Sequence, residues 1–135
     1  EIAGRGVATY ETPEDTPPDL ARLEAMIAAD PAITHVFAVH CETTSGILNP
    51  IGEIAALVKK QGRRLLVDSM SAFGAIEIDA RKVPYDALAA SSNKCLEGVP
   101  GLGFVVCRKE ALARCKGNAT TLVLDLFDQA EGFAR

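Results

Sequence analysis

Three clusters of polar side chains follow apolar segments of the sequence and could carry chemistry. The first is Glu42–Ser45, the second is Asp68 with Ser69 and Ser71, and the third is Ser91–Lys94. The segments before them are short and apolar, which is typical of buried strands. Because ligands of open parallel sheets collect at the carboxyl ends of the strands, these clusters are the first places to look for a site.

Lys94 is the candidate nucleophile of the third cluster. It lies between small polar residues and Cys95, and no acidic residue follows before Glu97. Most lysines in loops are ordinary surface groups. A lysine in a pocket with little water holds its proton less tightly, however, and its amine can then condense with a carbonyl compound to form a Schiff base. This chemistry needs a cofactor.

Asp68 is the candidate acid of the second cluster. It follows Leu65, Leu66 and Val67 without a break, so its carboxylate meets either solvent at the strand end or a cation in a cleft. The ordinary role of an aspartate at this position is to cap a loop or a helix. Strand alternation would place Asp68 and Met70 on the same side, so a flat ligand held at its edge by Asp68 would have Met70 against its face.

The glycine-rich segment Gly98–Gly103 has only a superficial likeness to a phosphate-binding loop. It precedes an expected strand rather than a helix, and it lacks the Lys-Ser or Lys-Thr pair of a P-loop. We expect a tight turn whose glycines let the backbone pass close to whatever Lys94 binds.

The elements that must position these clusters are alternating helices and strands. One helix is expected to begin at the N-cap candidate Thr16 and to end near Asp30–Pro31, and a second opens at Asn49–Pro50 and stops at Gly62. The expected extended segments are Thr34–His40, Arg64–Asp68, Ala75–Ile78, Tyr85–Ser91 and Gly103–Arg108. Strands separated by helices pair in parallel, so we predict an α/β fold with three layers, α/β/α, and a mainly parallel sheet.

The C-terminal part of the sequence predicts two further features. A short helix is expected over Glu110–Cys115. The apolar segment Leu122–Phe127 fits a core strand and an interface segment equally well.

Composition excludes several functional classes. The 135 residues hold 14 basic and 18 acidic side chains, and only two Tyr and five Phe, so no basic stripe or set of stacking aromatics favours nucleic acid. No apolar stretch reaches the length of about 18 residues that a membrane span requires. The four cysteines form no C-x-x-C pair, and the two histidines lack metal-ligand spacing, so we predict no metal site, free thiols and a cytoplasmic location.

Four longer motifs together resemble one known enzyme family. They are HCETTSGILNP from His40, VDSMSAFG from Val67, SSNKCLEGVPGLGFV from Ser91 and LDLFDQ from Leu124. In order and spacing they resemble the class V, fold-type I pyridoxal-phosphate aminotransferases across nearly the whole chain. Within that class the likeness is greatest to the branch that transfers the amino group of 2-aminoethylphosphonate to pyruvate in phosphonate catabolism.

The resemblance implies pyridoxal 5'-phosphate as the cofactor and a role for each site residue. Lys94 corresponds to the lysine that binds the cofactor covalently and later moves a proton between the substrate carbon and the cofactor. Asp68 corresponds to the acid that keeps the pyridine nitrogen protonated, and Met70 to the residue against the ring face. Thr43 corresponds to a hydroxyl near the phenolic oxygen of the ring, and Asn93 to a polar group that reaches the phosphate.

The sequence also departs from that family, whose members are more than twice as long. It lacks the upstream loop that grips the phosphate, the aromatic residue that stacks on the other ring face, and the small C-terminal domain with its substrate-binding arginine. We therefore expect residues 1–135 to be a single, incomplete cofactor-binding large domain that has little activity alone. The family likeness also implies a homodimer with active sites shared between the subunits.

Three alternatives remain open at this point. Asp68, Lys94 and Thr43 would equally serve a related class V aminotransferase that acts on alanine, serine or glyoxylate. A phosphoacceptor receiver domain has this size and an aspartate at a strand end, but it needs an acidic pair after its first strand, and Glu11, Glu14 and Asp15 lie in a proline-containing stretch instead. A non-catalytic fragment is the third alternative.

Overall fold

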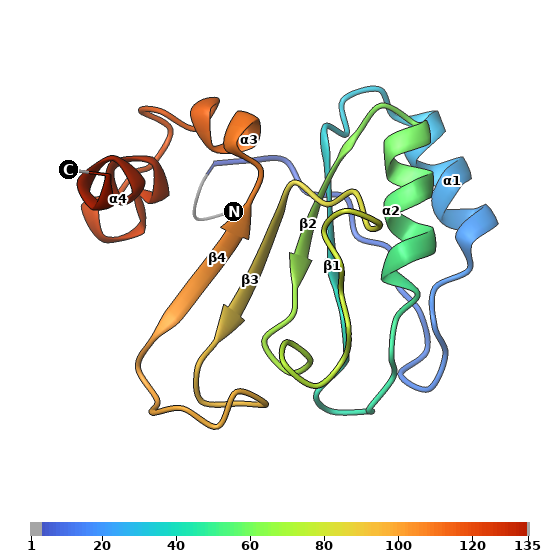
Figure 1. The fold of residues 1–135 in the computed structure, drawn as a ribbon. Coiled ribbons are helices and arrows are strands. Elements are labelled where there is room, and N and C mark those ends of the chain that lie inside the picture. The colour runs from blue at the N-terminus through green and yellow to red at the C-terminus, as the bar shows by residue number, and fades with distance from the viewer. Residues whose placement is uncertain (1–3, 135) are drawn as a thin grey trace.

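A sheet of four strands carries the three polar clusters in a computed structural model, which describes residues 4–134. The first half of this region contains α1 (Leu20–Ala29), β1 (His35–Val39), α2 (Ile51–Lys60) and β2 (Arg64–Asp68). The second half contains β3 (Ala87–Ser91), β4 (Gly103–Cys107), α3 (Lys109–Ala113), a 3-10 turn η1 (Leu122–Leu124) and α4 (Leu126–Phe133). Figure 1 shows these elements in chain order.

The sheet has the order β1-β2-β3-β4, and its first two pairings are parallel. The predicted α/β class with a mainly parallel sheet is confirmed. The last pairing, between β3 and β4, is antiparallel. Residues 92–102 join these two strands without a helix, and a connection of that kind returns the chain in the opposite direction.

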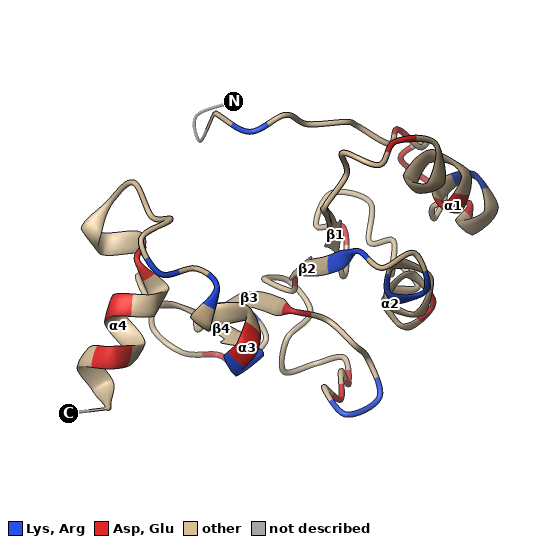
Figure 2. Ribbon diagram, turned by 90° about the horizontal axis from the view of Figure 1, so that it is seen from above, with Lys and Arg blue, Asp and Glu red and all other residues tan. Residues whose placement is uncertain are grey.

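The core lies between the sheet and α2. The apolar stripe of α2 is buried, with Ile51, Ile54, Ala55 and Val58 no more than 3% exposed. Leu65, Val67 and Leu88 of the sheet belong to the same cluster, as do Leu23 and Ile27 of α1. Figure 2 shows α1 and α2 on one side of the sheet and α4 beyond β4, away from them. Burial of each large side chain of this kind contributes about 1.5–3 kcal/mol.

The helix α1 begins later than the sequence predicts. Asp19, rather than Thr16, is its N-cap, and its Oδ1 accepts hydrogen bonds from the backbone N–H groups of Ala21 (2.8 Å) and Arg22 (3.1 Å). The cause is the pair Pro17–Pro18, because a residue before proline avoids helical dihedrals. The same rule ends α1 before Pro31, as predicted.

None of the helices within residues 4–134 is long and apolar enough to cross a membrane.

Two apolar segments differ from their predictions. Ala75–Ile78 is not a strand: Ala75 lies in a turn, Ile76 forms an isolated bridge with Phe73, and residues 77 and 78 are irregular. Leu122–Phe127 is not a core strand, because η1 and the start of α4 occupy it. Its side chains at 122, 123 and 124 are 81%, 77% and 74% exposed, so the described part of the chain leaves them open to solvent.

Candidate active site

The loops that carry the three polar clusters leave the sheet at the same edge, the lower one in Figure 1. Parallel pairing causes this arrangement, because β1, β2 and β3 all point that way. Asp68, the last residue of β2, has Val39 and Ala89 as its partners in register. The predicted clustering of the loops at the carboxyl ends of the strands is therefore seen in the structure.

Asp68 has the ordinary loop-capping role and keeps a free oxygen as well. Its Oδ1 accepts a hydrogen bond of 2.9 Å from the backbone N–H of Met70. Its Oδ2 accepts none from residues 4–134. The backbone is also fixed, since the N–H of His40 donates to the Asp68 carbonyl at 2.7 Å and the N–H of Ser69 donates to that of Ala89 at 2.9 Å. The half-buried carboxylate is thus oriented, with one oxygen available to a ligand.

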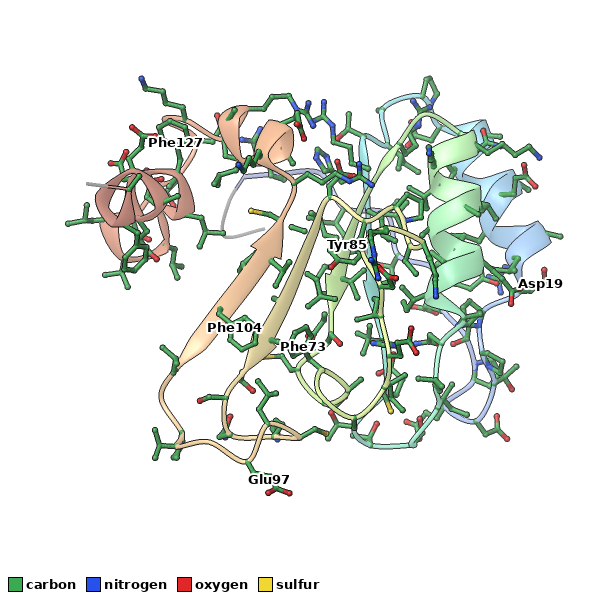
Figure 3. The ribbon with its side chains drawn as sticks, viewed as in Figure 1. Asp19, Phe73, Tyr85, Glu97, Phe104 and Phe127 are labelled. Atoms are coloured by element: carbon green, nitrogen blue, oxygen red, sulfur yellow. The ribbon has the colours of Figure 1, made fainter. Side chains whose placement is uncertain are left out.

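Lys94 lies in a tight turn after β3. The N–H of Gly98 donates to the carbonyl of Ser92 at 2.7 Å, and the N–H of Glu97 donates to the carbonyl of Lys94 at 2.9 Å. Glu97 has φ +57°, and its side chain points away from the molecule at the tip of the turn (Figure 3). Lys94 and Asn93 are exposed. The water-poor pocket that a nucleophilic lysine requires is therefore not built by residues 4–134 alone.

Thr43 lies at an exposed turn in the loop after β1. The N–H of Gly46 donates to the carbonyl of Glu42 at 2.8 Å, and Gly46 has φ +75°, which glycine adopts without strain. Asn49 closes this loop because its side-chain amide donates to the carbonyl of Val39 at 2.9 Å and to Oε1 of Glu42 at 3.3 Å. The hydroxyl of Thr43 is thus presented to solvent on a fixed loop.

Two hydrogen bonds join the three loops. The hydroxyl of Ser71 donates to the carbonyl of Cys41, which links the loop after β2 to the loop that carries Thr43. The thiol of Cys95 donates to the carbonyl of Ser71 at 3.3 Å. This bond links residues 93–102, called the lysine turn below, to the same loop. The neighbours of Thr43, Asp68 and Lys94 are therefore in direct contact.

A buried polar pair at this edge was not assigned from the sequence. His40 and Ser69 are 5% and 0% exposed, and Nδ1 of His40 lies 3.0 Å from Oγ of Ser69. Burial lowers the pKa of His40, so the neutral imidazole is favoured. The signal for this pair was its position, because each residue follows a strand directly. The pair joins the ends of β1 and β2.

Met70 lies beyond the end of β2, and the cavities lie away from the predicted site residues. The strand β2 ends at Asp68, so strand alternation does not reach Met70, which is 38% exposed, and its place against a ring stays a prediction. Two hollows of about 380 and 350 Å³ are lined by Phe73–Ile78 and by residues of all four strands, α3, η1 and α4, respectively. None of the predicted site residues lines either hollow. Within residues 4–134, the predicted site residues Thr43, Asn93 and Lys94 are exposed at this edge of the sheet.

Comparison with known proteins gives the family and the extent of the match. The sequence model of the family described as Aminotransferase class-V matches residues 3–122. The 2-aminoethylphosphonate–pyruvate transaminase of Pseudomonas putida (strain GB-1) is 55% identical over 129 residues, which cover 96% of this chain and 35% of that protein. A transaminase of the same name, numbered 1, from Polaromonas sp. (strain JS666 / ATCC BAA-500) is 56% identical over 132 residues, which cover 96% of this chain and 34% of that protein.

Solved structures give the same fold. Pyridoxamine-pyruvate aminotransferase from Mesorhizobium loti matches with a TM-score of 0.74 and 35% identity over 80% of this chain and 28% of that one. Ureidoglycine-glyoxylate aminotransferase from Bacillus subtilis matches with a TM-score of 0.82 over 93% of this chain and 33% of that one, at 22% identity, which shows the fold alone. This chain spans about a third of the length of the curated relatives it matches.

Proposed function

The chain belongs to the class-V aminotransferase family, and we propose that it forms the central part of the large, cofactor-binding domain of a pyridoxal-phosphate-dependent aminotransferase. Residues 1–135 then form one incomplete domain, and the remaining two thirds of such a protein lie outside them. Membership of this family excludes the receiver-domain alternative.

The proposed reaction transfers the amino group of 2-aminoethylphosphonate to pyruvate, giving phosphonoacetaldehyde and L-alanine in phosphonate catabolism. The support is that relatives 53–56% identical over nearly the whole chain are 2-aminoethylphosphonate–pyruvate transaminases. The second candidate is an aminotransferase that acts on alanine, serine or glyoxylate. Structures with such names, including an alanine–glyoxylate aminotransferase from Nostoc sp., are only 22% identical, so they support the fold and not this substrate.

The observation that carries the proposal is the gathering of an amine, a carboxylate and a hydroxyl on three linked loops at one edge of the sheet. These groups fit pyridoxal phosphate, which offers an aldehyde to the amine, a pyridine nitrogen to the carboxylate and a phenolic oxygen to the hydroxyl. When bound, this cofactor supplies an electron sink for negative charge at the substrate carbon. The free Oδ2 of Asp68 is the acceptor that a protonated ring nitrogen needs.

The proposed roles of the residues are those that the family resemblance implies. Lys94 would hold the cofactor through its Nζ, and the same amine would take and return a proton as general base and acid. Asp68, held in orientation by the N–H of Met70, keeps its negative charge towards the ring nitrogen. Thr43 would donate its hydroxyl near the phenolic oxygen, Asn93 would bind the phosphate, and Met70 would pack against the ring.

The complete protein must supply what this chain lacks. Lys94 is exposed here, so the segments that exclude water from it lie outside residues 4–134. We expect the 135-residue chain alone to bind the cofactor weakly and to show little turnover. We also propose that the complete protein is a cytoplasmic homodimer, for which the four free cysteines and the exposed apolar side chains of Leu122–Leu124 are the support.

The test is a side-by-side assay of the complete protein that contains this chain. With pyridoxal phosphate and pyruvate present, we expect alanine to form with a much larger kcat/KM for 2-aminoethylphosphonate than for serine. Alanine with glyoxylate as the acceptor is the matched control for the second candidate. A preference for that pair would replace the proposed substrate but keep the enzyme class, whereas no transamination with any pair would favour the non-catalytic alternative.

A further inference from the structure

We propose that the segment Ser69–Gly74, called the positioning loop below, sets the place of Lys94 through direct contacts with Cys95 and Leu96. This inference rests on the proposed function for the role of Lys94. The contacts themselves come from the structure alone. They make Gly74 and Cys95 positioning residues, which act through the lysine turn and not on the cofactor or substrate.

The first contact is a hydrogen bond beside the lysine. The thiol of Cys95 donates to the carbonyl of Ser71 at 3.3 Å. Ser71 is itself held, since its hydroxyl donates to the carbonyl of Cys41. A residue adjacent to Lys94 is thus connected, through the positioning loop, to the end of β1.

The second contact is a close approach at Gly74. A Cβ at this position would lie 2.8 Å from Cδ2 and 3.3 Å from Cγ of Leu96, and 3.5 Å from the carbonyl carbon of Cys95. Gly74 also has φ +99°, which side chains other than glycine rarely adopt. The Leu96 side chain therefore fills the space that the missing side chain of Gly74 leaves.

The positioning loop is fixed to the core, whereas the lysine turn is not. Ser69 and Ala72 are 0% and 1% exposed, and the carbonyl of Ser69 accepts hydrogen bonds from the N–H groups of Ala72 (3.1 Å) and Phe73 (2.9 Å). The rings of Phe73 and Phe104 meet edge to face with their centroids 5.3 Å apart (Figure 3). Residues 93–102 are all exposed. The rigid loop therefore determines where the exposed turn lies.

The arrangement couples the two proposed catalytic groups. Asp68 directly precedes the positioning loop, and Lys94 directly precedes the two residues that contact it. A shift of this loop would change the distance between the carboxylate and the amine. Because a misplacement of about 1 Å can lower a rate about a hundredfold, such a shift is visible in kcat.

The main test is a pair of variants in the complete protein, Gly74→Ala and the double variant Gly74→Ala/Leu96→Ala. The single variant forces a methyl group against Leu96, and we expect kcat to fall between about tenfold and a hundredfold with a smaller change in the KM for the amino donor. The double variant removes the obstructing side chain but keeps the backbone strain that φ +99° imposes on alanine, so we expect it to recover part of the loss. Leu96→Ala alone is the control for the effect of losing that side chain.

A second pair tests the hydrogen bond. Cys95→Ala removes the donor to Ser71 and should lower kcat by a few fold, in keeping with the modest strength of one hydrogen bond. Cys95→Ser keeps a donor and should recover activity. Thermal unfolding of each variant identifies any that fails to fold, and if Gly74→Ala is among them, this cysteine pair decides.

Hydrogen exchange provides a readout that does not depend on activity. In the protein without cofactor, the amides of Glu97 and Gly98 should exchange faster in Gly74→Ala than in wild type, and part of the protection should return in the double variant. Unchanged kcat and exchange in Gly74→Ala, or an unchanged kcat in Cys95→Ala, would overturn the proposal. If the wild-type protein shows no transamination, the proposed function fails, and the exchange comparison still decides whether these contacts set the turn.

Discussion

The edge that carries the polar clusters and the C-terminal region, residues 109–134, are held together in different ways. At the edge, side-chain hydrogen bonds join residues far apart in sequence, such as His40 with Ser69 and Ser71 with Cys41, which are 29 and 30 positions apart. In the C-terminal region the side-chain hydrogen bonds are local: Asp125 accepts from the N–H groups of Phe127 and Asp128 in the first turn of α4, and the side chain of Gln129 donates to the carbonyl of Val123, 6 positions away. The edge is polar, whereas Leu122–Leu124 are apolar and exposed.

This difference shows that residues 4–134 fix the loops of the edge by themselves, whereas the apolar surface of the C-terminal region needs other segments to cover it. Long-range bonds fix the loops of the edge before any ligand arrives, which is the preorganisation that catalysis requires. The C-terminal region forms its helices but does not bury their apolar neighbours, and apolar surface of this kind is typical of an interface. Substitutions at the edge should therefore change chemistry, and substitutions in the C-terminal region should change association.

The largest effect is expected at Lys94. In the complete protein, Lys94→Ala removes both the covalent attachment and the proton-transfer group, so we expect transamination to fall at least about a thousandfold. Lys109→Ala is the matched control, because Lys109 is an exposed lysine of the C-terminal region. The activity of this variant should stay near that of wild type. The measurement is alanine formation from pyruvate. Equal losses in both variants would remove the distinction between the two regions.

A smaller loss is expected from Asp68→Asn. The amide oxygen can still accept the hydrogen bond from Met70, but the negative charge is gone, and we expect kcat to fall about a hundredfold while the protein stays folded. Asp125→Asn is the control, since Asp125 also accepts backbone hydrogen bonds, from Phe127 and Asp128, and asparagine caps a helix as well as aspartate does. Steady-state kinetics and circular dichroism check both variants, and an active Asp68→Asn enzyme would contradict the role of the carboxylate.

The C-terminal region should instead control association. We expect Val123→Asp to weaken the proposed homodimer of the complete protein at least about tenfold, because a charge buried in an interface without a partner is costly. Val7→Asp is the matched control, as Val7 and Val123 are both 77% exposed in this chain. Sedimentation velocity over a range of concentrations measures the change. If Val123→Asp leaves the dimer intact, this segment is not the interface.

The smallest effect concerns pH and the buried His40. Because burial lowers the pKa of His40 in the folded protein, the unfolded state binds protons more readily, and the free energy of unfolding should fall as pH drops below about 6.5. His40→Asn should flatten this part of the stability curve. Burial also lowers the pKa of His35, so His35→Asn is needed to remove the remaining slope. Urea unfolding between about pH 5 and 7.5 measures how the free energy of unfolding depends on pH. If this dependence is the same in His40→Asn as in wild type, the role of the buried pair is contradicted.

The sequence predicted the fold best where the signal is local. Arg64–Asp68 is found as β2 with the predicted bounds, and α2 lies between the predicted start at Asn49–Pro50 and the predicted stop at Gly62, because apolar runs and helix-end residues are local signals. The predicted start of α1 at Thr16 is wrong because the proline pair after Thr16 delays the helix until Asp19. The 3-10 turn and helix at Leu122–Phe127 were missed because apolar character alone does not distinguish a buried strand from an exposed segment.

The sequence predicted part of the candidate site for a similar reason. Parallel pairing follows from the order of elements, so the meeting of the three loops at one edge was predictable. The bonds that join them, from Cys95 to Ser71 and from Ser71 to Cys41, end on backbone carbonyls, which carry no signal in a sequence. The roles of Lys94, Asp68, Met70, Thr43 and Asn93 toward the cofactor stay predictions.

The most direct test of the account is to locate the covalently bound cofactor. The complete protein is loaded with pyridoxal phosphate, reduced with sodium borohydride and digested, and the modified peptide is identified by mass spectrometry. We predict a single pyridoxyl-phosphate group on the Nζ of Lys94. A label on another lysine, or no label on a protein that transaminates, would contradict the assignment of this edge as the active site.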